Sequence, residues 1–234
     1  MASIYLIRHG QASFGQENYD QLSELGQKQA THLGQAIAQR VPNIDQVVLG
    51  GMQRHRQTAE NCLAGYEQRL ADSSPTIDAG WNEYDHQNIL AQLRPEYQTA
   101  AGMTEYIAAQ KNPKQVFEQD FNAAIDRWTS GQFDADYVET WQDYRQRVLT
   151  SLQRVVDASK TAKNLFVFTS GGPISVVAQH LLGVPAEQIM RMNWTLMNCA
   201  VTKLVTTSDR VFLSTLNEHT HFEGADNKHL ITYT

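Results

Sequence analysis

Three short, uninterrupted apolar runs constrain the fold of this chain more than any other feature of its sequence. They span residues 4–7, 47–49 and 165–168. Apolar runs of this length without polar alternation are typical of strands covered on both faces, as in parallel sheets. Each run precedes a segment with helical character, and alternating strands and helices indicate an α/β domain. The sequence therefore predicts three layers, with a mostly parallel central sheet flanked by helices.

The boundaries of the helices that follow these runs are indicated by capping residues. Ser23 is a candidate N-cap for a helix that reaches about Arg40, and the segment 52–66 is expected to form the next helix. After the third run, Pro173 suits the first helical position and Gly183 lies just past the helix end. A helix is therefore predicted after each of the three strands.

Residues 85–140 interrupt this alternation. They are rich in Gln, Ala, Asn and aromatic residues, with helical stretches at about 101–110 and 115–128 and no convincing strand. We expect this segment to form a helical cap insertion over one end of the sheet. Two strand-like runs between residues 199 and 216 then precede a polar tail. Because no repeat or linker divides the chain, we predict a single domain over residues 1–234 that carries the cap.

The composition is that of a globular protein without a surplus of positive charge. The chain has 234 residues, of which 41% are hydrophobic and 19% charged, and its formal net charge is −6. A general nucleic-acid binder needs a basic surplus to displace counterions from phosphates, so this class is not expected. An acidic chain can still bind a small phosphorylated substrate, or inorganic phosphate, where a few cationic groups converge.

The sequence contains no candidate membrane span or secretion signal. No segment approaches the ~18 apolar residues that span a bilayer, and no basic n-region precedes a cleavage site. Cys62 and Cys199 supply neither a disulfide framework nor a zinc knuckle. We expect a cytoplasmic protein with two buried thiols, no membrane partner, and no metal or organic cofactor. The oligomeric state stays open, with a homodimer as one option.

Polar residues follow two of the predicted strands where ligands bind in open α/β sheets, beyond the carboxyl ends of the strands. Arg8, His9 and Gly10 follow the first run, and Ser170 follows the third. Gly10 permits a tight turn that is expected to leave the His9 ring exposed. A neutral imidazole is a competent nucleophile, and the guanidinium of Arg8 matches phosphate or carboxylate oxygens. The alternative is a histidine that only bonds a backbone carbonyl, which the flanking arginines disfavour.

A second polar cluster lies near the start of the next helix, where backbone N–H groups favour anions. Arg54 is expected in the site, whereas His55 and Arg56 are expected on the solvated helix surface and outside it. Glu83 follows a short apolar patch, a setting suited to a general acid, with Asp85 as a nearby competitor. Two strand ends therefore each present an arginine beside a helix start.

With these motifs the chain resembles the histidine phosphatase superfamily, the phosphoglycerate-mutase-like proteins, over essentially its whole length. The matching pieces are LIRHGQ at 6–11, LSELGQKQA at 22–30, QRHRQTAE at 53–60, the Glu83 segment, ETWQDYRQRV at 139–148 and FTSGGPI at 168–174. The combination of LIRHGQ and QRHRQTAE, in this order along the chain, is specific to the family.

The resemblance implies a reaction cycle through a phosphohistidine. In that cycle His9 attacks the phosphorus and Glu83 protonates the leaving oxygen. Two arginines, Arg8 and Arg54, hold the non-bridging oxygens, and water then releases phosphate without a metal or organic cofactor. The phosphate-binding positions implied in this way are Arg8, Arg54, Gln11, Ser13 and Gly171.

Position 170 departs from the family pattern. Family members carry a second histidine in a Ser-His-Gly-Gly turn, where this chain has Thr169-Ser170-Gly171-Gly172. Losing one preorganised donor of this kind costs ~2.7–4 kcal/mol, or roughly 10²–10³ in rate. Ser170 still offers one O–H donor, and the helix start at Gly172-Pro173 offers backbone N–H dipoles. We therefore count Ser170 among the catalytic residues and expect weak or unusual activity.

The phosphate cradle departs from the family pattern as well. Ala12 stands where family members often carry Ser or Thr, and Gly15 stands where they often carry Asn. Ser13 or Asn18 is a candidate substitute for these side chains. One sequence leaves both options open.

Three functions fit these motifs. The first is a phosphomonoester hydrolase that acts through phosphorylated His9 on a small phosphorylated metabolite. The second is a phosphoglycerate-type mutase, and the third is a pseudoenzyme that binds phosphate esters without turnover. A serine hydrolase is not expected, because Phe168 stands where the first glycine of a G-x-S-x-G turn belongs. In the tail, His219 or His221 is a candidate for supplying the imidazole that position 170 lacks.

Overall fold

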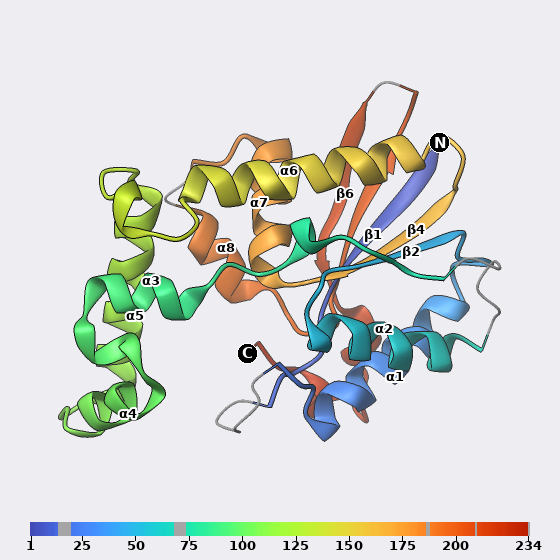
Figure 1. The fold of residues 1–234 in the computed structure, drawn as a ribbon. Helices are drawn as coiled ribbons and strands as arrows, with labels where there is room; N and C mark the ends of the chain where they lie inside the picture. Colours follow the sequence, from blue (N-terminus) through green and yellow to red (C-terminus); the bar gives the residue numbers. More distant parts are fainter. Residues whose placement is uncertain (14–19, 68–73, 186–187, 209, 234) are drawn as a thin grey trace. The chain divides into compact units, whose positions relative to one another are not determined.

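A computed structural model describes residues 1–13, 20–67, 74–185, 188–208 and 210–233 (Figure 1). The chain divides into two compact units, one of residues 1–83 with 147–234 and the other of residues 84–146. The sheet and every residue of the predicted site belong to the first unit. That the inserted segment covers one end of the sheet stays a prediction.

The first unit is built on one mixed sheet in the order β3-β2-β4-β1-β5-β6. Strands β3, β2, β4 and β1 pair in parallel, and β5 and β6 add antiparallel pairs at one edge. The predicted α/β fold with a mostly parallel sheet is confirmed. The strands are β1 (Ala2–Arg8), β2 (Gln46–Leu49), β3 (Thr76–Ile77), β4 (Asn164–Thr169), β5 (Val201–Thr206) and β6 (Val211–Glu218).

The helices fall between these strands as the alternation predicts. Ser23 caps the first helix by accepting a hydrogen bond of 3.0 Å from the Gly26 N–H. The third predicted helix begins at Gly171 and not at Pro173, and Gly183 ends it with a left-handed φ of 67°. The helices are α1 (Glu24–Ala38), α2 (Gln53–Tyr66), α3 (His86–Leu93), α4 (Ala100–Ala108), α5 (Pro113–Thr129), α6 (Trp141–Ala158), α7 (Gly171–Leu182) and α8 (Ile189–Thr195).

Helices α1 and α2 pack backbone to backbone on one side of the sheet (Figure 1). A Cβ atom on Gly34 would lie 1.9 Å from the Cys62 carbonyl oxygen, and one on Gly65 would lie 2.1 Å from that of Thr31. Only glycine permits so close an approach. Under the two helices lies a core of alternate strand residues and helix side chains, which includes Ile7, Val47, Leu49, Phe166, Phe168, Leu33 and Tyr66.

The other residues of the same strands are equally buried on the opposite face. Ile4, Leu6 and Val167 are fully buried. Helix α7 and the second half of α6 cover the face of the sheet opposite α1 and α2 (Figure 1). Burial on both faces is the reason that these strands read as continuous apolar runs in the sequence.

The tail is less polar in its packing than its sequence suggests. Phe222 and Leu230, each in a short 3-10 helix, are buried in the core under α1 and α2. Two hydrogen bonds of 2.7 Å from the Gln29 amide, to the Leu230 carbonyl and the Thr232 hydroxyl, hold the tail to α1. The polar tail that follows β6 is therefore partly buried in the core.

The second unit is a helical assembly with an aromatic core. The indole of Trp128 packs against Trp141 and Tyr144 at centroid distances of 5.2 and 5.5 Å. The buried Asp120 carboxylate accepts hydrogen bonds of 2.8 Å from both Arg94 and Tyr97. These contacts hold α3, α5 and the start of α6 together.

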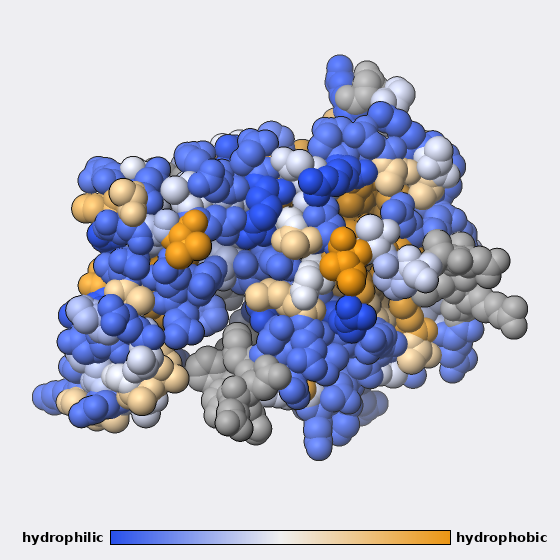
Figure 2. Space-filling model, viewed as in Figure 1, coloured by the Kyte–Doolittle hydropathy of each residue, from blue (hydrophilic) through white to orange (hydrophobic). Residues whose placement is uncertain are grey.

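On the face shown in Figure 2 the surface is mainly hydrophilic, and hydrophobic residues lie in small separate groups. Within the described part of the chain, no helix has the length and apolar character of a membrane span.

Candidate functional site

His9 lies directly after β1, at the edge where β1 and β4 both end. Its backbone N–H continues the parallel ladder with a 2.9 Å hydrogen bond to the Thr169 carbonyl. Its side chain is only 4% exposed, so the expectation of an exposed ring is wrong. The ring Nδ1 lies 2.7 Å from the Gly10 carbonyl oxygen. Because a carbonyl only accepts, Nδ1 carries the proton in the neutral ring, and Nε2 keeps a free lone pair.

The surroundings of His9 keep its imidazole neutral. Burial lowers its pKa well below the usual value, and the positive charges of Arg54 and Arg8 lower it further. A neutral ring with an unprotonated Nε2 is the form in which histidine acts as a nucleophile.

Gly10 is required for packing and not for exposing the ring. A Cβ atom here would lie 2.5 Å from the Gly26 carbonyl oxygen of α1. The Gly10 N–H donates a 3.0 Å hydrogen bond to the Thr58 hydroxyl of α2. The turn after β1 is therefore clamped between α1 and α2, which fixes the direction of the His9 ring.

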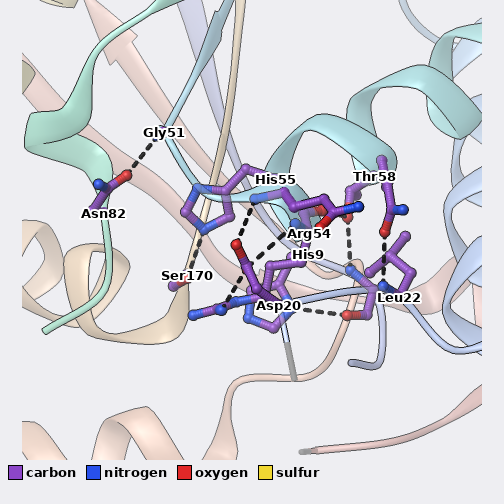
Figure 3. Close-up of polar contacts among 12 residues, drawn as sticks. His9, Asp20, Leu22, Gly51, Arg54, His55, Thr58, Asn82 and Ser170 are labelled. Carbon is purple, nitrogen blue, oxygen red and sulfur yellow. Dashed lines mark hydrogen bonds and ion pairs between the residues drawn. The ribbon is translucent and has the colours of Figure 1, made fainter. Parts of the chain in front are cut away.

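Arg54 enters the site from the first turn of α2 (Figure 3). It is 4% exposed, and its Nη1 forms a 2.8 Å ion pair with Asp20. The same carboxylate accepts a 2.8 Å hydrogen bond from the Gln53 N–H at the helix start. The start of α2 therefore already binds one anion, which is a carboxylate of this chain.

Arg8 is the last residue of β1 and directly precedes His9. Its Nη1 donates to the carbonyl oxygens of Leu196 and, at 3.3 Å, Tyr233. A Cβ atom on Gly171 would lie 3.6 Å from its Nε, so the guanidinium borders the first residue of α7. Backbone carbonyls thus orient the arginine fork toward the start of a helix.

Ser170 and His55 form a hydrogen-bonded pair in the interior (Figure 3). His55 Nε2 lies 2.7 Å from the Ser170 hydroxyl oxygen, and both residues are 0% exposed. The expectation that His55 lies on the solvated surface and outside the site is wrong, whereas Arg56 is exposed as expected. The ring centroids of His55 and His9 are 5.9 Å apart. Burial, helped by the charge of Arg54, lowers the pKa of His55 to about 3.

Glu83 reaches the start of α7. Its Oε2 accepts a 3.1 Å hydrogen bond from the N–H of Gly172, the second residue of α7 and two residues after Ser170. Asp85, the competing carboxylate, instead caps α3 by accepting a 3.0 Å hydrogen bond from the Asn88 N–H. The capping contact gives Asp85 a structural role, so Glu83 is the better candidate for the general acid.

The other predicted phosphate-binding residues line the turn after β1. Gln11 accepts a 2.9 Å hydrogen bond from the Ser23 hydroxyl, and the Ser13 N–H donates a 2.8 Å bond to the Gln21 carbonyl. These contacts tie the turn to the residues before α1. The candidate positions Gly15 and Asn18 lie outside the described residues.

The two tail histidines have other neighbours. His219 Nδ1 bonds the Asn217 carbonyl at 2.6 Å, and the His221 ring lies 4.1 Å from Phe222, centroid to centroid. The imidazole that lies beside His9 comes from α2 instead of the tail.

Sequence reasoning missed three contributors to this site. Asp20 pairs with Arg54, His55 pairs with Ser170, and the Asn198 amide donates a 3.1 Å hydrogen bond to the His9 carbonyl. For His55 a signal was present, because it shares a helical stripe with the buried residues Ala59 and Cys62.

No three His, Cys, Asp or Glu side chains gather to hold a metal ion in the part of the chain that the structure describes. What the arrangement offers is two cationic groups, the Ser170 hydroxyl and the start of α7, and one nucleophilic ring nitrogen at one strand edge. These groups suit an anion with several oxygens.

The sequence matches a family model, the histidine phosphatase superfamily (branch 1), over residues 4–97 and 86–219. No curated protein matches it. The chain also shares its fold with solved structures of low sequence identity. A phosphoglycerate mutase from Bacillus anthracis is 15% identical, with 94% of each chain covered and a TM-score of 0.65.

Two phosphatases are similar in the same way. A putative alpha-ribazole-5'-P phosphatase from Escherichia coli is 19% identical, with 93% of this chain and 96% of that one covered and a TM-score of 0.63. A mutant phosphoserine phosphatase from Entamoeba histolytica, in complex with phosphoserine, is 16% identical, with 94% and 99% covered and a TM-score of 0.64. With its family match over most of the chain, this protein belongs to the histidine phosphatase superfamily, whose fold it shares with both mutases and phosphatases.

Proposed function

We propose that this protein is a phosphomonoester hydrolase that works through a phosphohistidine at His9. The observation that carries the proposal is the state of the His9 ring. Its Nδ1 proton is held by the Gly10 carbonyl, and burial together with two guanidinium charges keeps the ring neutral. The ring therefore offers the Nε2 lone pair next to groups that bind anions.

The reaction that these residues support has two steps. In the first, the Nε2 lone pair attacks phosphorus, the P–O bond to the leaving group breaks, and Glu83 supplies a proton to the leaving oxygen. In the second, Glu83 takes a proton from water as the water oxygen attacks phosphorus. The P–N bond then breaks, and His9 and inorganic phosphate are regenerated.

The charges around His9 suit the transition state of this reaction. Arg8 and Arg54 are placed to stabilise the charge on the non-bridging oxygens. The Gly171 N–H at the start of α7 and the Ser170 hydroxyl add uncharged donors. Since these donors carry no full positive charge, we expect turnover well below that of an enzyme with a second imidazole cation, by roughly 10²–10³.

The substrate class proposed is a small phosphorylated metabolite. The family's structural neighbours include proteins named for phosphoserine and for glucosyl-3-phosphoglycerate, which are small phosphate esters. Asp20 already neutralises one side of Arg54. A substrate phosphate must therefore displace or share this carboxylate, which favours compact esters that can reach the Arg54 side chain.

The test is hydrolysis of p-nitrophenyl phosphate in the presence of EDTA, with wild type, His9→Ala and the control His180→Ala. His180 is an exposed histidine on α7. We expect turnover in the wild type and the control and none in His9→Ala. Rapid acid-free quenching followed by mass spectrometry should find the phosphoryl group on His9. A label on another side chain would refute the proposal.

Ser170 favours one alternative, a phosphate-binding pseudoenzyme. Calorimetric titration with inorganic phosphate separates the two functions, because the pseudoenzyme binds phosphate without hydrolysing any ester. In that case Ser170→His should create turnover that the natural chain lacks. Transfer of the phosphoryl group to an added alcohol in place of water would point to mutase-type chemistry.

A further inference from the structure

His55 is a buried polar residue that the proposed reaction does not yet use. Its imidazole is 0% exposed, although burying an unprotonated ring that is only partly hydrogen-bonded costs free energy. A hydrophobic residue at this position of α2 would extend the apolar stripe formed by Ala59 and Cys62. A buried polar ring in such a place calls for a specific partner.

That partner is Ser170. The hydrogen bond between His55 Nε2 and the Ser170 hydroxyl oxygen is 2.7 Å long and joins the first turn of α2 to the residue before α7. Figure 3 shows the pair beside His9, and the two imidazole centroids are 5.9 Å apart. The His55 ring is therefore near the nucleophile, and its contact with the residue after β4 is the hydrogen bond to the Ser170 hydroxyl.

The direction of this hydrogen bond follows from the other ring nitrogen. His55 Nδ1 lies against Gly50, and its contact with the Gly50 backbone falls short of normal hydrogen-bond geometry. Nε2, by contrast, has the Ser170 hydroxyl oxygen at 2.7 Å. A neutral imidazole has one N–H, which is costly to bury without a well-placed acceptor. The proton is therefore placed on Nε2, which donates it to the Ser170 oxygen.

A hydroxyl group that accepts from His55 has its own proton left to give. Since the His55 bond occupies one side of the Ser170 oxygen, the O–H of Ser170 is directed away from α2. Arg8 of β1 pairs with Thr169 of β4, so His9 and Ser170 are the next residues at the same edge of the sheet, and Ser170 directly precedes α7. A phosphoryl group on His9 would be bound at this edge. Hydrogen bonds that polarise one another in series are stronger than isolated ones.

We propose that His55 is a positioning residue that acts through Ser170: it donates from Nε2 to the hydroxyl oxygen and aims the hydroxyl proton at the phosphoryl group on His9. This inference rests on the proposed function. It assigns to α2 the imidazole that is missing from the turn after β4, with serine as the connecting group.

The first test measures the tautomer and needs no activity. In ¹⁵N-labelled wild-type protein at pH 7, the histidine signals that are missing from His55→Leu belong to His55. We expect Nε2 at a pyrrole-type shift and Nδ1 at a pyridine-type shift. The reverse pattern would place the proton on Nδ1 and make Ser170 the donor to His55, which overturns the inference.

The second test is a double-mutant cycle on the hydrolysis of p-nitrophenyl phosphate. We expect Ser170→Ala to lower kcat by about 10²–10³ and His55→Leu to lower it by about 10–10². In the Ser170→Ala background, His55→Leu should add no loss beyond about twofold, because His55 acts only through Ser170. Full additivity of the two effects would contradict the inference.

Two further variants separate positioning from a purely structural role. His55→Gln keeps a side-chain N–H and should recover part of the kcat lost in His55→Leu, with KM changed less than kcat. The control His32→Leu removes a half-buried imidazole of α1 that bonds the His221 carbonyl, and it should leave kcat unchanged. Equal losses in His32→Leu and His55→Leu would reduce both effects to general destabilisation and overturn the inference.

A swap of the two side chains gives a positive readout. His55→Ala opens space beside residue 170, and Ser170→His in that background places an imidazole there directly. The double variant should exceed His55→Ala in kcat, whereas no gain would contradict the inference. The proposed function fails separately, if wild type shows no turnover or His9→Ala keeps it. Two measurements then still decide the role of His55. They are the tautomer of His55 in the wild type and the phosphate affinity of His55→Leu, which we expect to be several-fold weaker than that of the wild type.

Discussion

Acidification should destabilise this protein through its buried histidines, and His55 allows the effect to be calculated. The pKa of His55 falls to about 3 in the folded chain because its ring is buried. In the unfolded chain its pKa returns to about 6.5. The unfolded state therefore takes up the proton first, and folding free energy is lost as pH falls from about 6.5 toward 3.

The magnitude follows from the width of this window. One pKa unit corresponds to about 1.4 kcal/mol, and pH 5 lies about 1.5 units below the unfolded pKa. Protonation of His55 in the unfolded state thus removes about 2 kcal/mol of stability between pH 7 and pH 5. His221, whose pKa burial lowers to about 4, contributes a loss of similar size over the same range.

The assay is urea-induced unfolding at pH 7, 6 and 5, with wild type, His55→Gln and the control His180→Gln. His55→Gln cannot titrate, so its stability should fall by about 2 kcal/mol less than that of wild type over this range. The comparison concerns the slope with pH and does not depend on the stability of the variant at pH 7. Parallel pH profiles for wild type and His55→Gln would refute the reasoning, as would a flattened profile for the exposed His180 control.

Three other perturbations test the site and its support. Asp20→Asn should lower the inhibition constant of inorganic phosphate several-fold, since a neutral amide no longer competes with phosphate for Arg54. Weaker phosphate inhibition would contradict the competition between Asp20 and phosphate. Glu83→Gln should lower kcat far more for an alkyl phosphate than for p-nitrophenyl phosphate, whose leaving group needs no proton; equal losses would remove Glu83 as the acid. Gly34→Ala should cost about 1–3 kcal/mol in urea unfolding, because its methyl group meets the Cys62 carbonyl; an unchanged midpoint would mean that α1 and α2 separate at no cost.

The sheet was predictable from the sequence because its strands are buried on both faces. Burial of this kind leaves only apolar residues between Asn164 and Thr169, the two ends of β4, so the centre of the strand is visible in the apolar run alone. By contrast, β3 has two residues with exposed side chains, and it gave no such signal. Its existence depends on pairing with β2, which local sequence does not encode.

The site residues that could be predicted are those whose type is unusual at the end of a strand or the start of a helix. The site residues that depend on tertiary packing could not be predicted. His9 and Arg54 stand out as charged or titratable groups next to apolar segments. The burial of His55 depends on how α2 rotates against the sheet, and the Asp20 contact depends on where the residues just before α1 lie. Both are distant in sequence from the groups that they bond.

The two buried cysteines have a practical consequence for measuring these variants. Burial raises the pKa of the Cys62 thiol to about 12, and it raises that of Cys199 as well. A thiol that is both shielded and protonated does not react with disulfide reagents such as Ellman's. Folded molecules therefore do not react with the reagent, and the rate of the colour reaction measures how often the structure opens. Because both cysteines are natural, local unfolding around α2 and the start of β5 can be measured without introducing a label.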